Sequence, residues 1–251
     1  MIQLSAVVIT YNEEKNIERC IQSLKKVADE IVVVDSFSTD GTEKICRSLK
    51  VKFVQHKFQG HIQQKNFAIT QTTNKWVLSV DADEMLSDEL TKSILSIKQN
   101  PQFDGYFMNR LNNYCGQWIK YCGWYPDKKL RLWNSGKGKW QGENPHDEFV
   151  MNENCSTGFL QGDLLHYTIA SVEAHQLQIE KFTTIAAQQL FAKHKNTNWF
   201  FIYSSTAFRF LKDYFFRLGF LDGYYGLMIC RGNARYNFLK YSKLLKLNST
   251  K

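Results

Sequence analysis

The chain has 251 residues and a formal net charge of +8, with 43% hydrophobic and 22% charged residues. This length and composition are ordinary for a globular protein that buries a large core. They exclude a very small domain and a highly polar, disordered chain. One catalytic domain with an appendage is therefore the starting expectation.

The positive charge is concentrated near the C-terminus. From residue 199 to 251 the chain has nine Lys or Arg residues against only Asp213 and Asp222, so this tail carries +7 of the +8. Such a distribution suggests an anionic partner, which could be a membrane surface, an acidic glycolipid or a nucleic acid. Composition does not choose among these three.

The apolar run from Met1 to Ile9 lacks preceding basic residues and a small-residue cleavage site, so it predicts a first strand rather than a signal peptide. We expect a cytoplasmic protein. The six cysteines form no Cys-x-x-Cys pair and no zinc-like spacing, which favours reduced, mostly buried thiols.

Short apolar runs alternate with helical patterns over the first hundred residues. The predicted strands are 4–10, 31–35, 51–55 and 76–80, and the predicted helices are 14–26, 41–49 and 61–71. This alternation predicts an α/β fold in which a mostly parallel sheet has helices on both faces.

The amino-acid composition and the hydrophobic pattern change after residue 101. Residues 102–165 are aromatic and rich in turn residues, which indicates short mixed strands and loops, whereas 171–194 predicts a helix and the chain from 199 onward is aromatic, basic and helical in patches. We therefore expect a catalytic domain over 1–170 that consists of two halves, 1–100 and 101–170. A C-terminal helical extension is expected over 171–251.

Three polar clusters follow the first, second and fourth predicted strands: Thr10-Tyr11-Asn12-Glu13-Glu14, the segment 35–42 and Asp81-Ala82-Asp83-Glu84. Parallel strands bring their carboxyl ends to one edge of the sheet, where ligands bind in open α/β folds. Each of the first two clusters also has a structural explanation. Asn12 or Glu13 would cap the next helix, and Ser38-Thr39-Asp40-Gly41 is ordinary turn chemistry before a helix.

The acidic cluster is harder to explain structurally, because it ends a strand that reads as fully buried. Asp81 and Asp83 are two residues apart, so their side chains point the same way in an extended chain. Carboxylate oxygens suit Mg²⁺ or a similar hard cation that keeps coordination sites for phosphate oxygens. The cluster therefore predicts a divalent metal and a diphosphate.

Neither a P-loop nor a Gly-x-Gly-x-x-Gly motif follows the first strand, which argues against a P-loop ATPase and a dinucleotide dehydrogenase. A nucleotide could instead be held by carboxylates on its base and ribose. Asp35 is a candidate acceptor for a uracil N–H, with Lys65 as a supporting positive or hydrogen-bonding group.

These residues resemble glycosyltransferase family 2, and within it the bacterial lipopolysaccharide core β-glucosyltransferase group. The resemblance covers nearly the whole chain. It is carried by the segments 8–14, 33–36, 40–42, 81–84, 125–127, 130–133, 146–147, 220–223 and 239–241.

The resemblance implies a GT-A fold and an inverting transfer of a hexose, glucose from UDP-glucose, onto a sugar of a lipopolysaccharide core or a related bacterial surface glycan. It implies that residues 1–100 form the nucleotide-sugar-binding half and residues 101–170 the acceptor-side half of the catalytic domain. It also implies that Tyr11, Glu13 and Asp35 contact the nucleoside. It further implies that Asp81 and Asp83 face the ribose, the diphosphate and Mg²⁺ or Mn²⁺, with Asp83 as the direct ligand.

Inversion by a single displacement also requires a base that removes a proton from the acceptor hydroxyl. The segment 143–148 offers three carboxylates, from which we choose Asp147 and keep Glu148 as a rival; a solvated acidic loop is the structural alternative. Arg131 could form a bidentate contact with phosphate. His166 could contact the diphosphate or metal, although a lone histidine is more often structural.

The uncharged stretches of the tail are too short to span a bilayer. Its mixture of basic and aromatic residues suggests a peripheral contact with anionic lipid on the inner face of the cytoplasmic membrane. A helical subdomain packed on the core or a homodimer contact is the alternative.

Two other functions remain open. One is a sugar-phosphate nucleotidyltransferase, which would be expected to carry a glycine-rich loop after the first strand. The other is a non-catalytic protein that binds an anionic surface or nucleic acid. For the glycosyltransferase that we favour, we expect no nucleic-acid partner.

Overall fold

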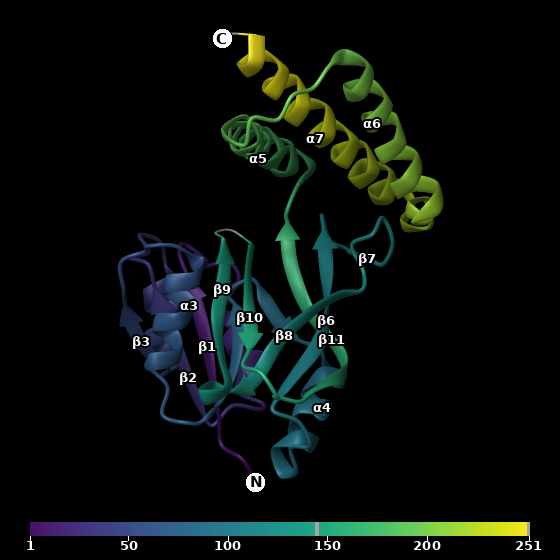
Figure 1. The fold of residues 1–251 in the computed structure, drawn as a ribbon. Helices are drawn as coiled ribbons and strands as arrows, with labels where there is room; N and C mark the ends of the chain where they lie inside the picture. The colour runs from purple at the N-terminus through teal and green to yellow at the C-terminus, as the bar shows by residue number, and fades with distance from the viewer. Residues whose placement is uncertain (144–145, 250–251) are drawn as a thin grey trace. The chain divides into compact units, whose positions relative to one another are not determined.

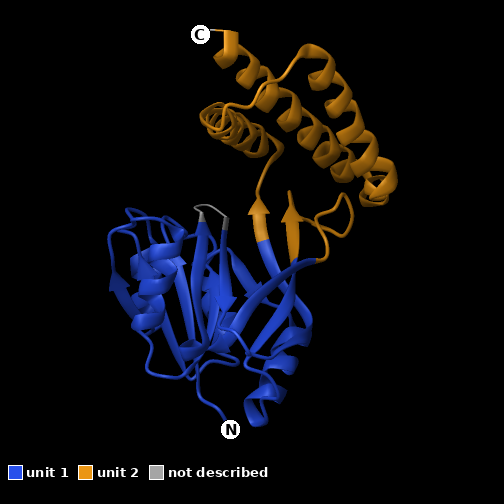
Figure 2. Ribbon diagram, viewed as in Figure 1, with its two compact units in different colours: residues 1–110, 127–166 blue, residues 111–126, 167–251 orange. Residues whose placement is uncertain are grey.

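The computed structural model describes residues 1–143 and 146–249, which fall into two compact units (Figure 2). Unit 1 contains residues 1–110 and 127–166, and unit 2 contains residues 111–126 and the chain from 167 onward. The functional division predicted at residue 170, between a catalytic domain and an extension, stays a prediction.

A nine-stranded mixed sheet organises the fold, with the strand order β3-β2-β1-β4-β8-β6-β11-β5 and β7 paired to β6 (Figure 1). The first four strands in sequence, β1 to β4, are parallel to one another, and β8 joins the edge of β4 in the antiparallel sense. Strands β9 and β10 form a separate antiparallel pair. The strands are β1 (Leu4–Thr10), β2 (Glu30–Asp35), β3 (Lys52–Gln55), β4 (Trp76–Asp81), β5 (Glu84–Leu86), β6 (Gly105–Tyr114), β7 (Gln117–Ile119), β8 (Asp127–Asn134), β9 (Gly138–Glu143), β10 (His146–Met151) and β11 (Thr157–Ile169).

Alternate residues of the parallel strands supply two hydrophobic cores, because successive side chains of a strand point to opposite faces of the sheet. Ala6 and Val8 belong to a core with apolar residues of α1 (Ile17–Leu24) and α4 (Asp88–Gln99). Val7 belongs to the other core, which includes residues of α3 (His61–Thr70) and of the β9–β10 pair. Helices therefore cover both faces, which confirms the predicted α/β fold class.

Helix α4 was missed from the sequence, although its start has a recognisable signal. The hydroxyl of Ser87 accepts a hydrogen bond from the backbone N–H of Leu90 at 3.1 Å, and Asp88 and Glu89 occupy the first turn. A side-chain cap and acidic residues at this end stabilise the exposed N–H groups of a helix. Helix α2 (Thr42–Ser48) agrees closely with its predicted range.

Helix α1 begins at Ile17, three residues later than predicted, and Asn16 is its N-cap. Asn12 does not cap this helix. Its side-chain oxygen accepts a hydrogen bond from the backbone N–H of Thr39 at 2.8 Å, and its own N–H donates to the Ser38 hydroxyl at 2.8 Å. The residues expected to start the helix therefore join the loops that follow β1 and β2.

Unit 2 contains three long helices: α5 (Val172–Ala192), α6 (Trp199–Leu211) and α7 (Gly223–Ser249). Helix α7 packs against both α5 and α6 (Figure 1). A π-helical turn, Lys212–Phe216, and a 3₁₀ turn, Gly219–Asp222, connect α6 to α7. In the described part of the chain, no helix combines the length and apolar character needed to cross a membrane.

The cysteines are free thiols, as the sequence predicted. Four of the six are buried, and two of these, Cys122 and Cys230, are in contact inside unit 2 with their sulfur atoms 3.6 Å apart. Buried thiols of this kind behave mainly as small apolar side chains.

Candidate active site

The ends of β1, β2 and β4 meet at one edge of the parallel sheet, as predicted. In the strand register Thr10 is opposite Asp35, and Ile9 is opposite Asp81. The polar clusters that follow these strands are therefore neighbours in space, even though about seventy residues separate the first from the last. This edge is where an open α/β sheet binds its ligand.

The clusters after β1 and β2 form one connected loop structure. The backbone N–H of Glu13 donates to the Thr42 hydroxyl at 2.9 Å, and the N–H of Gly41 donates to a Glu14 carboxylate oxygen at 2.8 Å. The carboxylate of Asp40 accepts from the N–H of Thr42 at 3.0 Å, as the turn interpretation predicted. These bonds fix the loops that flank the strand ends.

Asp35 is fully buried at the end of β2 and accepts hydrogen bonds from both the N–H and the hydroxyl of Ser38. Glu13 accepts from the Asn16 side chain at 2.6 Å, and burial raises the pKa of its carboxyl group. Tyr11 is exposed, whereas Thr10 is buried and its hydroxyl has no hydrogen-bond partner among the described residues. An exposed ring beside buried acceptors suits a nucleoside, which has both a flat face and N–H donors.

Asp81, the last residue of β4, is held by two buried cations. Its carboxylate lies 2.8 Å from the Nη2 atom of Arg131 on β8 and 3.1 Å from the Nζ atom of Lys65 on α3. Burial alone would raise the pKa of Asp81, but the charges of Arg131 and then Lys65 outweigh it and hold this pKa well below its usual range. Asp81 is therefore a firmly ionised carboxylate that is already paired.

Glu84 and Arg110 extend this network, and the sequence analysis gave neither of them a role. The fully buried side chain of Glu84 contacts Arg131 at 3.2 Å and Arg110 at 3.4 Å, and it accepts from the backbone N–H of Asp81 at 2.9 Å. Arg110 also pairs with Asp127 at 2.8 Å. The position of Glu84 directly after Asp81-Ala82-Asp83 was a usable signal, but nothing in the sequence links Arg110, on β6, to this site.

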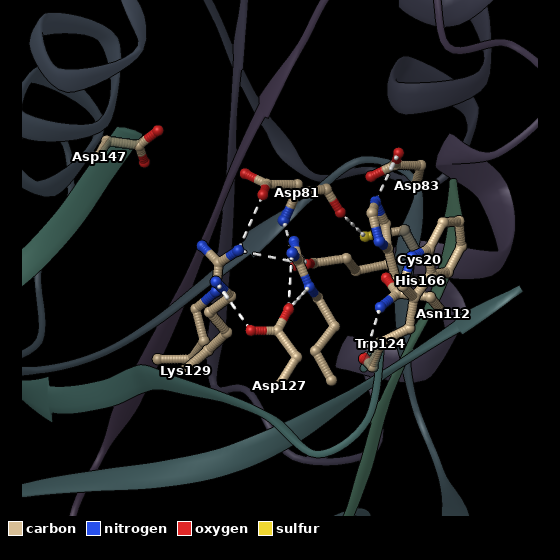
Figure 3. A network of polar contacts seen from close by, with 12 residues as sticks. Cys20, Asp81, Asp83, Asn112, Trp124, Asp127, Lys129, Asp147 and His166 are labelled. Atoms are coloured by element: carbon tan, nitrogen blue, oxygen red, sulfur yellow. Dashed lines mark hydrogen bonds and ion pairs between the residues drawn. The ribbon is translucent and has the colours of Figure 1, made fainter. Parts of the chain in front are cut away.

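Asp83 lies apart from the cations that hold Asp81. One of its carboxylate oxygens lies 3.2 Å from the Nε2 atom of His166 on β11 (Figure 3). Both side chains are partly exposed. The register of β11 against β5 pairs His166 with Glu84, so the strands bring this histidine to the acidic cluster. From the sequence, a contact with the diphosphate or metal and a structural role were both open for His166.

The residues around Asp83 fit a weakly ligated divalent ion. Within the described ranges, no three His, Cys, Asp or Glu side chains form a metal-binding group. Mg²⁺ and similar ions, however, are commonly bound through one or two carboxylates together with waters and substrate phosphates. Asp83 and His166 supply an oxygen and a nitrogen donor for such a site, whereas both oxygens of Asp81 face cations.

Asp147, on β10, is also joined to Lys65, whose Nζ atom lies 2.8 Å from its carboxylate. Only 12% of the Asp147 side chain and 5% of the Lys65 side chain are exposed to solvent. The rival, Glu148, is exposed. The side chain of Glu143, the third candidate, and residues 144–145 lie outside what the structure describes.

Lys65 was expected beside a uracil, but the structure places it between Asp81 and Asp147. Its Nζ atom also lies 4.4 Å from the ring centre of Trp140, a buried residue of β9. The guanidinium group of Arg131 lies 5.6 Å from the same ring. Lys65 thus links the donor-side carboxylate to the candidate base.

Several buried donors of this cluster have no hydrogen-bond partner within the described part of the chain. They are the Nε and Nη1 atoms of Arg131 and the indole N–H of Trp140. Leaving a buried donor unpaired costs about 1–3 kcal/mol. An anionic ligand that accepted from the guanidinium group would recover part of this cost.

A family model described as "Glycosyl transferase family 2" matches residues 5–151, which include every residue of this site except His166. The chain belongs to glycosyl transferase family 2. The protein is accordingly a glycosyltransferase, and the fold described above is the mixed α/β architecture expected for it.

Relatives in the family match the chain over nearly its full length. An uncharacterized glycosyltransferase of Rickettsia typhi is 31% identical over 99% of this chain and 88% of its own. The lipopolysaccharide core biosynthesis glycosyltransferase LpsC of Rhizobium meliloti is 28% identical over 100% of this chain and 94% of its own. Among solved structures, TarS residues 1–349 of S. aureus align over 100% of this chain and 92% of that chain, with 18% identity and a TM-score of 0.48.

Proposed function

We propose that this chain transfers a hexose, glucose from UDP-glucose, onto a sugar of a lipopolysaccharide core or a related surface glycan. The observation that carries the proposal is the buried Asp81–Lys65–Asp147 bridge at the carboxyl edge of the parallel sheet. The full-length similarity to LpsC, a lipopolysaccharide core biosynthesis glycosyltransferase, supports the class of acceptor. Such an acceptor is lipid-linked, so we propose that the enzyme works at the inner face of the cytoplasmic membrane.

On this proposal the nucleoside of the donor lies over the loops after β1 and β2. Asp35 and Glu13 accept from its N–H and hydroxyl groups, and Tyr11 packs on a flat face. The arrangement is supported by the adjacency of Thr10 and Asp35 in the register and by the bonds that fix both loops. The segment Asp81-Ala82-Asp83 then faces the ribose and the diphosphate.

The diphosphate would be neutralised from two sides. Asp83 and His166 would hold Mg²⁺ or Mn²⁺, which stabilises negative charge on the departing diphosphate when bound. Arg131 would contribute its unpaired N–H groups to the phosphate oxygens. Asp81 would act mainly by holding Arg131 and Lys65 in place.

Asp147 would act as the base of a single displacement. Its carboxylate takes the proton of the acceptor hydroxyl while the acceptor oxygen forms a bond to the anomeric carbon. The bond from that carbon to the diphosphate oxygen breaks, and the nucleoside diphosphate leaves with the electron pair. Attack opposite the leaving group inverts the anomeric configuration.

The test is a comparison of Asp147→Asn with the matched control Glu148→Gln. General-base catalysis contributes about 10²–10⁴-fold, so we expect Asp147→Asn to lose at least a hundredfold in glucose transfer while its UDP affinity stays within about threefold of wild type. Glu148→Gln should retain transfer, because that side chain is exposed. Normal turnover by Asp147→Asn, or loss of turnover only in Glu148→Gln, would reject Asp147 as the base.

A further inference from the structure

Helix α6 of unit 2 and the π-helical turn that follows it present apolar side chains to solvent. Four large residues, Phe200, Phe208, Leu211 and Phe215, are exposed, with exposed fractions of 83% for Phe200 and 63% for Phe208. The spacing of eight and three residues places Phe200, Phe208 and Leu211 on one side of α6, and Phe215 follows in the π-helical turn. We call these four residues the aromatic face.

The rest of α6 explains why this side stays outside. Ile202 is its fully buried residue, and Phe201, although 44% exposed, makes an edge contact with Tyr241 of α7, so α7 covers the opposite side of the helix. Trp199 and Tyr203, which stack on each other, are exposed as well. Between the exposed rings, the Ser204 hydroxyl donates to the Phe200 carbonyl at 2.8 Å and is therefore satisfied. Large apolar side chains gathered on an exposed helix face commonly mark an interaction site.

The apolar surface continues past the end of α6. Four further large apolar residues are exposed between α6 and α7; they are Phe216, Leu218, Phe220 and Leu221. Phe216 is 81% exposed. The patch is therefore longer than one helix face.

The charge of the segment that carries the aromatic face favours an anionic occupant. The only acidic residues between 181 and 249 are Asp213 and Asp222, and both are buried. Asp213 pairs with Arg209 at 2.6 Å and Arg217 at 3.1 Å, and Asp222 accepts from the backbone N–H of Tyr121 at 2.8 Å. The described surface of residues 181–249 consequently presents basic side chains and no acidic ones.

A second copy of the chain is a poor occupant, because a symmetric contact would set the same positive surface against itself. An anionic bilayer suits both the apolar side chains of the aromatic face and the positive charge of this segment. Phenylalanine and leucine side chains enter the boundary between headgroups and acyl chains, and Lys and Arg meet the lipid charges, each contributing an attraction that falls with added salt.

We propose that α6 and the turns after it lie flat on a bilayer that contains anionic phospholipid, with the aromatic face in the headgroup region. The link to a lipid-borne acceptor rests on the proposed function, whereas the binding itself does not. This contact explains an apolar and basic surface that glucose transfer does not require.

The test is flotation of the full chain with vesicles of phosphatidylcholine alone and with one quarter phosphatidylglycerol. We expect binding only to the anionic vesicles. The double variant Phe200→Ser, Phe208→Ser should bind at least about tenfold more weakly, because each ring buries a large apolar area. Leu177→Ser on α5 is the matched control, since Leu177 is 74% exposed, and it should bind like wild type.

Circular dichroism of each variant checks folding, and donor hydrolysis, measured without vesicles, should be unchanged in the double variant. If the wild-type chain hydrolyses the donor but does not bind anionic vesicles, this inference is overturned and the proposed function is not affected. If the wild-type chain binds vesicles but does not hydrolyse the donor, the proposed function is contradicted and this inference is not. Equal binding by the double variant and wild type overturns the inference. A concentration-dependent dimer in solution that the double variant abolishes would also overturn it, by assigning the face to a second copy.

Discussion

Lys65 lies between two carboxylates, those of Asp81 and Asp147, and almost none of its side chain reaches solvent. A buried cation in this position offsets the cost of burying two negative charges near each other. Removing it leaves both carboxylates partly uncompensated. The consequence should be visible in stability as well as in activity.

We predict that Lys65→Met lowers the free energy of unfolding by about 3 kcal/mol, the usual cost of breaking a buried ion pair by removing one partner. Lys26→Met is the control, because Lys26 pairs with Asp88 on the surface at 3.1 Å and should cost less than about 1 kcal/mol. Urea unfolding at neutral pH measures both. Equal losses in the two variants would contradict the role assigned to Lys65.

Asp81 provides a prediction about pH. Its pKa in the folded protein lies well below that of the unfolded chain, because the charges of Arg131 and Lys65 outweigh the effect of burial. A depressed folded-state pKa contributes stability that is present above the unfolded pKa of about 4 and is lost as the pH falls through the folded pKa. The stability difference between wild type and Asp81→Asn should therefore be constant from pH 7 to 5 and shrink below about pH 4. Urea unfolding at pH 7, 5 and 3.5 measures it, and a difference that grows on acidification would contradict the assignment.

The residues of the site differ in how far the sequence could predict them. The neighbourhood of Asp35 and Asp81 follows from the parallel order of the strands, so it was predictable. The partners of Lys65 were not, since they depend on how α3 faces β10, and Lys65 and Asp147 are 82 positions apart. The same holds for Arg110, which reaches Glu84 from an antiparallel strand.

Among the elements, the close approach of β11 to α4 requires glycine at residue 162. Gly162, on β11, has a φ of +91°, and a Cβ atom there would lie 2.2 Å from the backbone nitrogen of Leu90. Gly116 has the same φ of +91°, but a Cβ atom there would meet nothing within 4 Å. Alanine substitutions at these two glycines therefore distinguish the cost of a positive φ, which both share, from the cost of steric overlap, which only Gly162 would have.

We predict that Gly162→Ala destabilises the protein by about 2 kcal/mol more than Gly116→Ala. Both variants carry the strain of a positive φ, about 1 kcal/mol, and only the first forces the backbone of α4 away from β11. Thermal unfolding of both variants measures the difference. Equal melting temperatures would show that α4 moves aside at no cost.

The predicted strand ranges agree with β1 to β4 to within one residue at each end, because buried parallel strands are short apolar runs bounded by polar residues. Helix starts were less predictable. Residues 12–16 carry good capping side chains, yet Asn12 bonds to Thr39 instead, a tertiary contact that local pattern does not encode. For α4 the local pattern, a capping Ser87 before two acidic residues, is sufficient to predict where the helix starts.

At the scale of the whole molecule, the acidic and basic groups that the two proposals use belong to different segments of the chain. The carboxylates of the proposed donor site belong to unit 1, whereas the basic and aromatic surface belongs to unit 2. The sequence predicted this division from the +7 charge of residues 199–251. It could not show that Asp213 and Asp222 are buried, which leaves the described surface of that segment without acidic side chains.

The central claim is that Asp81-Ala82-Asp83 forms the metal-assisted donor site, and thermal unfolding with UDP and Mn²⁺ tests it most directly. Ligand at a hundred times its Kd stabilises a protein by about 2.7 kcal/mol, which for a chain of this size raises Tm by roughly 5–10 °C. We predict this rise for wild type and for the surface control Asp88→Asn, a dependence on Mn²⁺, and its loss in Asp83→Asn. An unchanged rise in Asp83→Asn, or no rise in wild type, would contradict the claim.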